Sequence, residues 1–394
     1  MAYTVSVVTG TRAEFGLLRP VAQRIFQDGT LSLQLIVTGA HLCAALGSTR
    51  EEIVQSGLPI AAELDILGGD PACAPAQAVA RALTLFSAYW EIHRPDAVVL
   101  LGDRYEAFAV ATAAAALRIP IAHIGGGDVT AGAMDEYYRH SITKMSALHF
   151  PICEGSRKRI IQLGEDPSTV FNTGSSGAQN IREIPPLSRE ELQAQLGFRM
   201  DRPFLLCTLH PETLSAVSPS ECAQILLNAL ALCGLPVLFT AANADQGGAE
   251  INRTIARWCA EREDAKLVQS LGARRYLSAM RYCAAVVGNS SSAIVETPTL
   301  RVPAVNIGDR QTGREKGENN IDAPWDAAAI AAAIRRAVSP AFAKQIAGMK
   351  SPYGDADTAD EIVRILKSRL VRGISLQKTF YDIAFDCPDA PKEE

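Results

Sequence analysis

Short apolar segments rich in β-branched residues recur along the chain, and helical patterns follow them. The first is residues 4–9, which ends at Gly10 and precedes a helix-like stretch over residues 17–26. Further strands are expected at residues 33–37, 97–101, 119–124, 204–208, 236–240 and 284–287. Strands that alternate with helices predict an α/β fold with parallel, doubly wound sheets.

A polar, proline-bearing stretch at residues 182–203 separates two series of such units. We therefore predict two Rossmann-like domains facing a cleft, over residues 1–180 and 181–355. Residues 356–394 are predicted to form a helix and a tail that return to the N-terminal domain, with a disordered end at 387–394. In such sheets ligands bind beyond the carboxyl ends of the strands.

Composition narrows the class of protein. The 394 residues carry a net charge of −5, so we expect no nucleic-acid or membrane partner. The nine cysteines are scattered singly without metal-ligand spacing, which favours reduced core thiols and predicts no metal site. No secretory signal and no apolar run of membrane-spanning length is present, so a cytoplasmic, soluble protein is expected.

Two loops of the first half combine glycine with charged residues. The loop GTRAEFG places Arg12 between a strand and a helix start, which predicts an anion site, although a plain strand-to-helix turn would use glycine as readily. The segment LLGDRYEA places Asp103 directly after a strand. That carboxylate is a candidate acid or base, and the alternative is a helix N-cap.

The segment HIGGGDVTAGAMDEYYRHSITK, residues 123–144, is the richest in chemistry. Three glycines follow an apolar strand, and acids, bases and cations then crowd into a short stretch. Asp128 and Asp135 are candidate catalytic acids, and Arg139 and His140 are candidate substrate-binding residues. If the segment is helical, Asp135 and Arg139 share one face.

The second half offers three more candidate segments. His210 follows a strand, where an imidazole could meet a phosphate or move a proton; a core or capping histidine is the alternative. The segment GNSSSAIVE supplies Ser290 and Ser291 at a probable helix start and Glu296 two turns later, which suggests a diphosphate cradle rather than a plain serine cap. The loop at residues 307–320 carries Arg310 and is interpreted as a lid or clamp.

Taken in order, the motifs GTRAEFG, GDRYEA, HIGGGDVTAGAMDEYYRHSITKMSALHF, LHPET, GNSSSAIVE and IGDRQTGRE resemble the UDP-N-acetylglucosamine 2-epimerase family, and RHSITKMSALHF resembles its hydrolysing branch. The resemblance implies the glycosyltransferase B architecture, with the catalytic acids in the N-terminal domain and UDP bound mainly by the C-terminal domain. It also implies diphosphate contacts at Ser290 and Ser291, a ribose contact at Glu296, nucleotide contacts from Arg12, His210 and Arg310, and catalytic carboxylates at Asp103 and Asp135.

One position departs from the family pattern. A third acid often lies two residues after the histidine that corresponds to His123, where this chain has Gly125. Asp128 is the local replacement that we consider.

The reaction implied converts UDP-N-acetylglucosamine, or a UDP-2,4-diacetamido-2,4,6-trideoxyhexose, and water to UDP and the free 2-epimer through a 2-acetamidoglucal. No cofactor is predicted, and a homodimer or homotetramer is expected. The alternatives are a non-hydrolysing epimerase, a glycosyltransferase of the same architecture, and a catalytically silent nucleotide-sugar sensor, which Gly125 favours.

Overall fold

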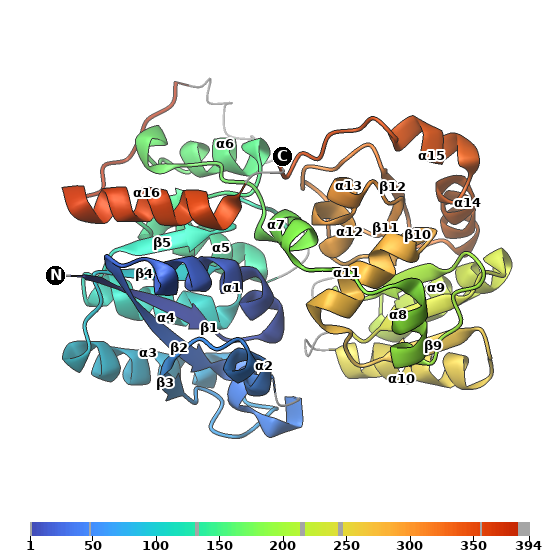
Figure 1. Cartoon of the computed structure of the whole chain (residues 1–394), viewed down its shortest axis with the longest axis horizontal. Helices are drawn as coiled ribbons and strands as arrows, with labels where there is room; N and C mark the ends of the chain where they lie inside the picture. The colour runs from blue at the N-terminus through green and yellow to red at the C-terminus, as the bar shows by residue number, and fades with distance from the viewer. Residues whose placement is uncertain are drawn as a thin grey trace, which may run out of the picture.

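A computed structural model describes residues 2–46, 49–130, 134–212, 217–242, 247–354 and 357–384, and it contains two parallel six-stranded sheets (Figure 1). The predicted α/β class with two Rossmann-like domains is therefore confirmed. The predicted disordered end at residues 387–394 lies outside the described residues.

The N-terminal sheet has the strand order β3-β2-β1-β4-β5-β6. Every neighbouring pair is parallel. Its strands are β1 (Tyr3–Thr9), β2 (Leu31–Thr38), β3 (Ile60–Leu64), β4 (Ala97–Leu101), β5 (Ile121–Ile124) and β6 (Leu148–Phe150).

The C-terminal sheet has the equivalent order β12-β11-β10-β7-β8-β9, again fully parallel. Its strands are β7 (Leu205–Thr208), β8 (Val237–Thr240), β9 (Ala265–Val268), β10 (Ala285–Gly288), β11 (Ala304–Ile307) and β12 (Asn320–Ala323). In both sheets the order reverses between two central strands, β1 and β4 in the first and β7 and β10 in the second. Such switch points are where open α/β sheets bind ligands.

Helices cover both faces of each sheet. They are α1 (Arg12–Gln27), α2 (Arg50–Gln55), α3 (Pro75–Ile92), α4 (Tyr105–Ala116), α5 (Asp135–Met145), α6 (Glu154–Gln162), α7 (Ser176–Glu183), α8 (Arg189–Leu196), α9 (Pro219–Cys233), α10 (Gly248–Ala260), α11 (Gly272–Tyr282), α12 (Ser292–Val295), α13 (Thr297–Leu300), α14 (Ala327–Ala337), α15 (Pro340–Ile346) and α16 (Thr358–Arg372), with 3-10 turns at Gly39–Leu42, Ala44–Leu46 and Pro167–Thr169.

Each sheet has an apolar core on both of its faces. Fully buried Phe86 and Trp90 of α3 pack under one face of the N-terminal sheet, and Leu18 and Ile25 of α1 pack on the other. Two corresponding clusters flank the C-terminal sheet. Strand residues buried on both faces explain why the central strands are continuous apolar runs.

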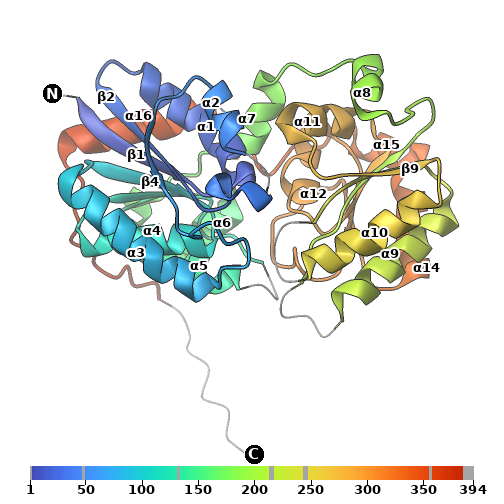
Figure 2. The same cartoon turned by 90° about the horizontal axis from the view of Figure 1, so that it is seen from below.

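Two helices tie the halves of the chain together. Helix α7 lies between the domains in both views (Figures 1 and 2), and the side-chain amide of Asn180 donates to the carbonyl of Gly16 in α1 at 2.8 Å. After α15, the chain returns to the N-terminal domain, where Ile362 and Leu366 of α16 join the same core cluster as α1. The polar stretch at residues 182–203 that separates the two series contains a helix, α8, which Ser188 caps with a capping box.

Gly288 shows why one glycine is required at the end of a central strand. Its φ is +134°, and a Cβ at this position would overlap the carbonyl oxygen of Thr208 on the neighbouring strand. Only glycine allows β10 and β7 to come this close at the switch point.

Eight of the nine cysteines lie in the described residues and all eight are free thiols. No helix in the described ranges has the length and apolarity needed to cross a membrane.

Candidate active site

The two switch points bring most of the predicted site residues to the ends of four strands. Asp103 follows β4, and the loop of Arg12 follows β1, in the N-terminal sheet. His210 follows β7, and Ser290 follows β10, in the C-terminal sheet. The charge of Arg310 acts on both sets of residues. It adds to the influences that lower the pKa of Asp103 and His210, and it opposes those that raise the pKa of Asp135.

The amides of the first loop already bind a carboxylate of the protein. Glu14 accepts hydrogen bonds from the backbone amides of Gly10 and Thr11 at 2.8 and 3.0 Å, and it completes a capping box with Thr11. Because these amides already bind Glu14, the group of the predicted anion site that is left to bind a ligand is the guanidinium of Arg12. It forms an ion pair with Glu52 and lies beside Gly272 at the start of α11, so it reaches the C-terminal domain.

Asp103 is not a helix N-cap. Helix α4 begins two residues later with Arg104 as its cap residue, and the Asp103 carboxylate instead accepts hydrogen bonds from Nε (3.0 Å) and an Nη of Arg139. Burial would raise the pKa of Asp103, but the charge and hydrogen bonds of Arg139, together with the charges of Arg314 and Arg310, hold it below its ordinary value. Asp103 is therefore ionised at neutral pH.

Arg139 does not act where we expected. Its side chain is fully buried, and its guanidinium donates to Asp103, to Glu136, to the Asp128 carbonyl and to the Thr130 hydroxyl. These oxygens occupy all three guanidinium nitrogens, so the geometry does not favour the predicted contact of Arg139 with substrate. Arg139 positions the carboxylates around it.

Asp135 begins α5 and is half-buried. Burial, and then the negative charge of Asp103, raise the pKa of Asp135 to about 6, against the charges of Arg310 and Arg104. Two nearby carboxyl groups with pKa values pushed in opposite directions are the arrangement that divides acid and base roles.

Asp128 has other partners for its carboxylate than Asp103 and Asp135. It is buried, accepts a hydrogen bond from the Ser156 hydroxyl at 2.9 Å, and lies 3.5 Å from Nε of Arg314. Its carboxylate therefore anchors the glycine loop to α6 and to the C-terminal domain. The geometry does not favour Asp128 as the replacement for a third acid.

The glycine loop itself is tightly packed. A Cβ on Gly126 would come within 2.8 Å of Nδ1 of buried His123, and a Cβ on Gly127 would overlap the Ser156 carbonyl. At Gly125 a Cβ would meet nothing nearer than the Gly102 amide at 3.9 Å, but φ is +78°, which disfavours a side chain. At Gly125, where the family pattern often has a third acid, the backbone conformation therefore favours glycine.

His140 lies one helical turn from Glu136 on α5. Its Nε2 is 3.4 Å from Oε2 of Glu136, and 29% of the side chain is exposed. His140 is accessible to a ligand, in contrast to Arg139.

His210 is held in place through its backbone. The side chain of Asn289 accepts from the His210 amide at 2.7 Å and donates to the His210 carbonyl at 2.8 Å. Burial, and then the charge of Arg310, lower the pKa of the imidazole to about 3. His210 is neutral at physiological pH, so it can donate a hydrogen bond but cannot supply a positive charge or a readily exchanged proton.

Ser290, Ser291 and Glu296 surround the short α12. Ser290 is 8% exposed, and Ser291 precedes the first residue of the helix. Burial raises the pKa of Glu296 to about 7, and its Oε2 is buried with no hydrogen-bond partner among the described residues. A buried acceptor without a donor suits a ligand hydroxyl.

Two functional positions were missed by sequence reasoning. Asn289 lies inside the GNSSS motif, but its role in bracing His210 depends on a contact between residues 79 positions apart. Arg314 lies in the loop at residues 307–320 and was not a candidate site residue, yet it contacts Asp128 of the other domain. Neither contact has a local sequence signal.

Paired Rossmann-like domains with polar groups at both switch points define a two-domain α/β protein with a candidate ligand site at the strand ends. The model of the family described as UDP-N-acetylglucosamine 2-epimerase matches residues 23–367 of this chain. The chain belongs to the UDP-N-acetylglucosamine 2-epimerase family, in its hydrolysing branch.

Three relatives place it there. The chain is 40% identical to a hydrolysing GDP/UDP-N,N'-diacetylbacillosamine 2-epimerase of Campylobacter jejuni, over 81% of this chain and 83% of the relative. It is 37% identical to polysialic acid biosynthesis protein P7 of Escherichia coli (95% and 96%). It is 32% identical to a hydrolysing UDP-N,N'-diacetylbacillosamine 2-epimerase of Legionella pneumophila (93% and 96%).

Solved structures share the fold. A UDP-N-acetylglucosamine 2-epimerase of Neisseria meningitidis, bound to UDP-N-acetylglucosamine, superposes with a TM-score of 0.79 at 17% identity, covering 93% of this chain and 100% of that one. A Listeria monocytogenes structure described as a 2-epimerase of the same kind gives 0.80 at 18% identity, covering 98% and 100%.

Proposed function

We propose that this enzyme hydrolyses a UDP-linked 2-acetamido sugar with inversion at carbon 2, releasing UDP and the free 2-epimer. The observation that carries the proposal is the carboxylate pair Asp103 and Asp135, with divergent pKa values, within electrostatic reach of Arg310 and His210. Acid and base groups thus lie beside a cation and a neutral hydrogen-bond donor suited to a departing diphosphate.

The first half of the reaction breaks the bond between carbon 1 and the UDP oxygen. That bond's electron pair leaves with UDP, and its charge is stabilised by Arg310, the neutral imidazole of His210 and the hydroxyls of Ser290 and Ser291. A carboxylate base removes the proton from carbon 2, and the double bond of a 2-acetamidoglucal forms. Asp135 is the stronger base of the pair because its pKa is the higher.

The second half adds water to the glycal. The water oxygen bonds to carbon 1, and carbon 2 receives a proton on the face opposite to the one that lost it, which inverts the centre. This step needs a proton donor distinct from the first base. Asp103 lies on a different loop from Asp135 and is oriented by Arg139. Because Asp103 is ionised in the free enzyme, we assign it to take a proton from the attacking water and to pass that proton to carbon 2.

The uridine ribose is assigned to Glu296. Its unpartnered Oε2 can accept from a ribose hydroxyl, and the burial that raises its pKa makes that hydrogen bond strong once the carboxylate is ionised. Arg12 of the N-terminal domain, beside Gly272, would close the nucleotide site from the other side.

Two sugar nucleotides are candidates for the substrate. Two of the relatives are named for N,N'-diacetylbacillosamine and one for polysialic acid biosynthesis, so the proposal covers UDP-N-acetylglucosamine and its 2,4-diacetamido-trideoxy analogue. Cytoplasmic localisation and a dimer or tetramer are part of the proposal and are tested by fractionation and light scattering.

Release of free UDP is the direct assay. Purified enzyme should release UDP from one of the two sugar nucleotides, together with one equivalent of reducing sugar. Reversible interconversion of the two UDP-sugars without free UDP would indicate the non-hydrolysing reaction. Tight UDP binding without turnover of either substrate would indicate the sensor and overturn the proposal.

A further inference from the structure

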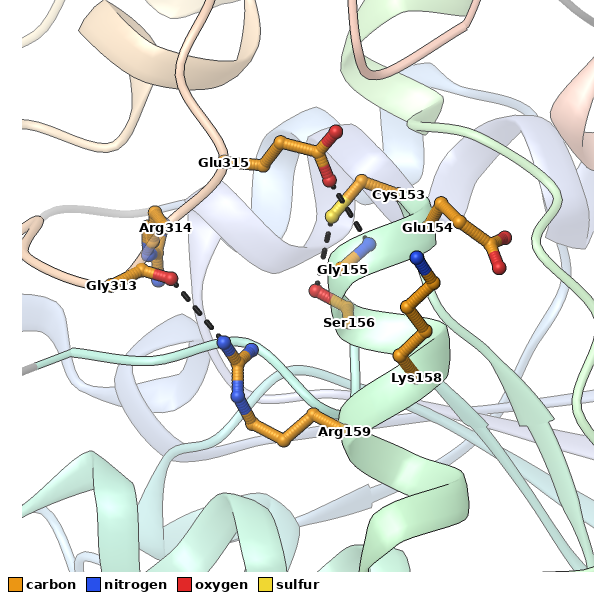
Figure 3. A pocket seen from close by; sticks show the side chains of 9 residues that line it. All are labelled: Cys153, Glu154, Gly155, Ser156, Lys158, Arg159, Gly313, Arg314 and Glu315. Atoms are coloured by element: carbon orange, nitrogen blue, oxygen red, sulfur yellow. Dashed lines mark hydrogen bonds between the residues drawn. The ribbon is translucent and has the colours of Figure 1, made fainter.

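Three consecutive residues of the loop after β11 join the C-terminal domain to the N-terminal domain. The carbonyl of Gly313 accepts a hydrogen bond from Arg159 at 3.4 Å, and the carboxylate of Glu315 accepts one from the Gly155 amide at 3.0 Å (Figure 3). Between them, Nε of Arg314 donates to the Val129 carbonyl at 2.8 Å. The loop lies across the start of α6, beside a cavity of about 370 Å³.

Arg314 differs from its two neighbours in what it touches. Its side chain is 9% exposed, and besides Val129 it contacts the Asp128 carboxylate at 3.5 Å and the Thr130 hydroxyl at 3.1 Å. The Thr130 oxygen also accepts from Arg139 at 2.6 Å. A hydroxyl oxygen has two lone pairs, so one buried atom joins the two guanidiniums.

From Thr130 the contacts continue to the reacting carboxylate. Arg139 donates to Asp103 through Nε at 3.0 Å. Arg314 is therefore two hydrogen-bonded residues away from Asp103, although it belongs to the other domain.

The same loop is fixed at its other end to the nucleotide side. The buried Gln311 side chain donates to the Asn289 carbonyl at 2.8 Å, and Asn289 braces His210. A continuous set of hydrogen bonds thus runs from the His210 side of the site through one loop to Asp103. Energetic coupling between the His210 side of the site and Asp103 requires a contiguous set of contacts such as this one, and mutation tests whether the two are coupled.

We propose that Arg314 is a positioning residue that aligns the Thr130, Arg139 and Asp103 contacts when the nucleotide site is occupied. This inference rests on the proposed function and assigns Arg314 no contact with substrate. Its effect should therefore appear in turnover rather than in nucleotide affinity.

The test compares Arg314→Met with the wild type in UDP release and in UDP binding by calorimetry. We expect kcat to fall at least tenfold while the Kd for UDP changes less than threefold, and Arg314→Lys to recover part of the rate. Thr130→Val removes the shared hydroxyl without touching the loop after β11 and should give a similar fall. The double variant should be no slower than the worse single variant, because both act on one set of contacts.

Two matched controls separate positioning from general domain contact. Lys316→Met removes another cation of the loop, which pairs with Asp322 in its own domain at 2.6 Å, and should leave kcat unchanged. Glu315→Ala breaks a second interdomain contact without touching Asp128 or Thr130. A fall in kcat for Glu315→Ala equal to that of Arg314→Met would overturn the proposal, as would an unchanged kcat in Arg314→Met.

A measurement that does not depend on turnover tests this inference separately from the proposed function. In hydrogen exchange, UDP should protect the amides of residues 127–130 in the wild type but not in Arg314→Met. Wild-type enzyme that shows this protection but no UDP release would contradict the proposed function alone. Equal protection in the wild type and in Arg314→Met would contradict the role of Arg314.

Discussion

Nε of Arg139 lies 3.0 Å from Oδ2 of Asp103, and it joins a fully buried cation to a carboxylate 36 positions earlier in the chain. The contact with Arg139 keeps Asp103 ionised and in one orientation before substrate binds. Preorganised groups of this kind need no rearrangement during the reaction.

Asp103→Asn should remove catalysis without removing nucleotide binding. The amide can still accept from Arg139, so the fold is retained, but it cannot exchange a proton. We expect kcat for UDP release to fall about 10³-fold, within the range for loss of a general acid or base, with the Kd for UDP nearly unchanged. The matched control is Asp96→Asn at the opposite end of β4, where the carboxylate accepts from the Thr4 amide at 2.7 Å. Loss of activity in the control, or full activity in Asp103→Asn, would contradict the role.

Asp135 should control the acid side of the pH–rate profile. The base must be ionised to remove a proton, and the pKa of Asp135 is raised to about 6. In enzyme carrying Glu296→Gln, which removes the pH dependence expected for nucleotide binding, we therefore expect kcat/KM to rise about tenfold per unit below pH 6 and to level off above it. A flat profile between pH 5 and 7 would exclude Asp135 as the base.

The same raised pKa predicts a gain in stability when the charge is removed. The folded state binds the proton of Asp135 more tightly than the unfolded chain does, so its contribution is fully present below about pH 3.9 and is lost as the pH rises through about 6. Asp135→Asn should then raise the Tm at pH 7.5 by about 2 °C, about 1 kcal/mol after allowing for the partial exposure of the group. At pH 4 the variant should show no gain. A lower Tm at pH 7.5 would contradict the burial argument.

Glu296 should make nucleotide affinity depend on pH. Ribose hydroxyls donate to the ionised carboxylate, and the pKa of Glu296 in the free enzyme is about 7. In Asp103→Asn enzyme, which prevents turnover, the affinity for UDP-N-acetylglucosamine should weaken up to about tenfold from pH 8 to pH 6. Adding Glu296→Gln should flatten this dependence and weaken binding at pH 8 by about 1–3 kcal/mol. Glu318→Gln, an exposed glutamate on a nearby loop, is the control and should change neither.

The C-terminal tail should stabilise the N-terminal domain through Lys378. Its ammonium donates to the backbone carbonyls of Lys144 and Ser146 at the end of α5 and to buried Glu165 at 2.6 Å. Lys378→Met leaves these oxygens short of a donor and should lower the free energy of unfolding by about 1–2 kcal/mol in denaturant titration. The control Lys367→Met removes a half-exposed pair with Asp28 and should cost less than about 1 kcal/mol. Equal losses in the two variants would contradict the tail's role.

The central strands were predictable because burial on both faces makes them continuous apolar runs. The prediction for residues 97–101 coincides with β4, and the one for 204–208 extends β7 by a single residue. Strands β3, β6, β9, β11 and β12 were missed. Strand β3 is an edge strand with alternating partial exposure, and none of the four residues of β9 is fully buried. Strands β6 and β11 are fully buried but only three and four residues long, and β12 is partly exposed. Edge strands and very short strands lack the long apolar run from which a strand is predicted.

The site was predictable where strand ends supply its groups and unpredictable where distant residues complete it. Asp103, His210 and Ser290 follow central strands, so topology alone brings them to the switch points. The burial of Arg139 could not be inferred, because it depends on Thr130 and Asp103 closing around the guanidinium. The contact of Arg314 with Thr130 joins residues 184 positions apart, and no local pattern encodes it.

The central claim is inversion at carbon 2 with release of free UDP, and proton NMR in deuterated water tests it directly. The enzyme would be incubated in parallel with UDP-N-acetylglucosamine and with its 2,4-diacetamido-trideoxy analogue. We predict that one of them yields UDP and a free 2-epimer carrying deuterium at carbon 2, because solvent supplies that proton. A free sugar that keeps its original hydrogen and configuration at carbon 2 would mean simple hydrolysis and would contradict the account.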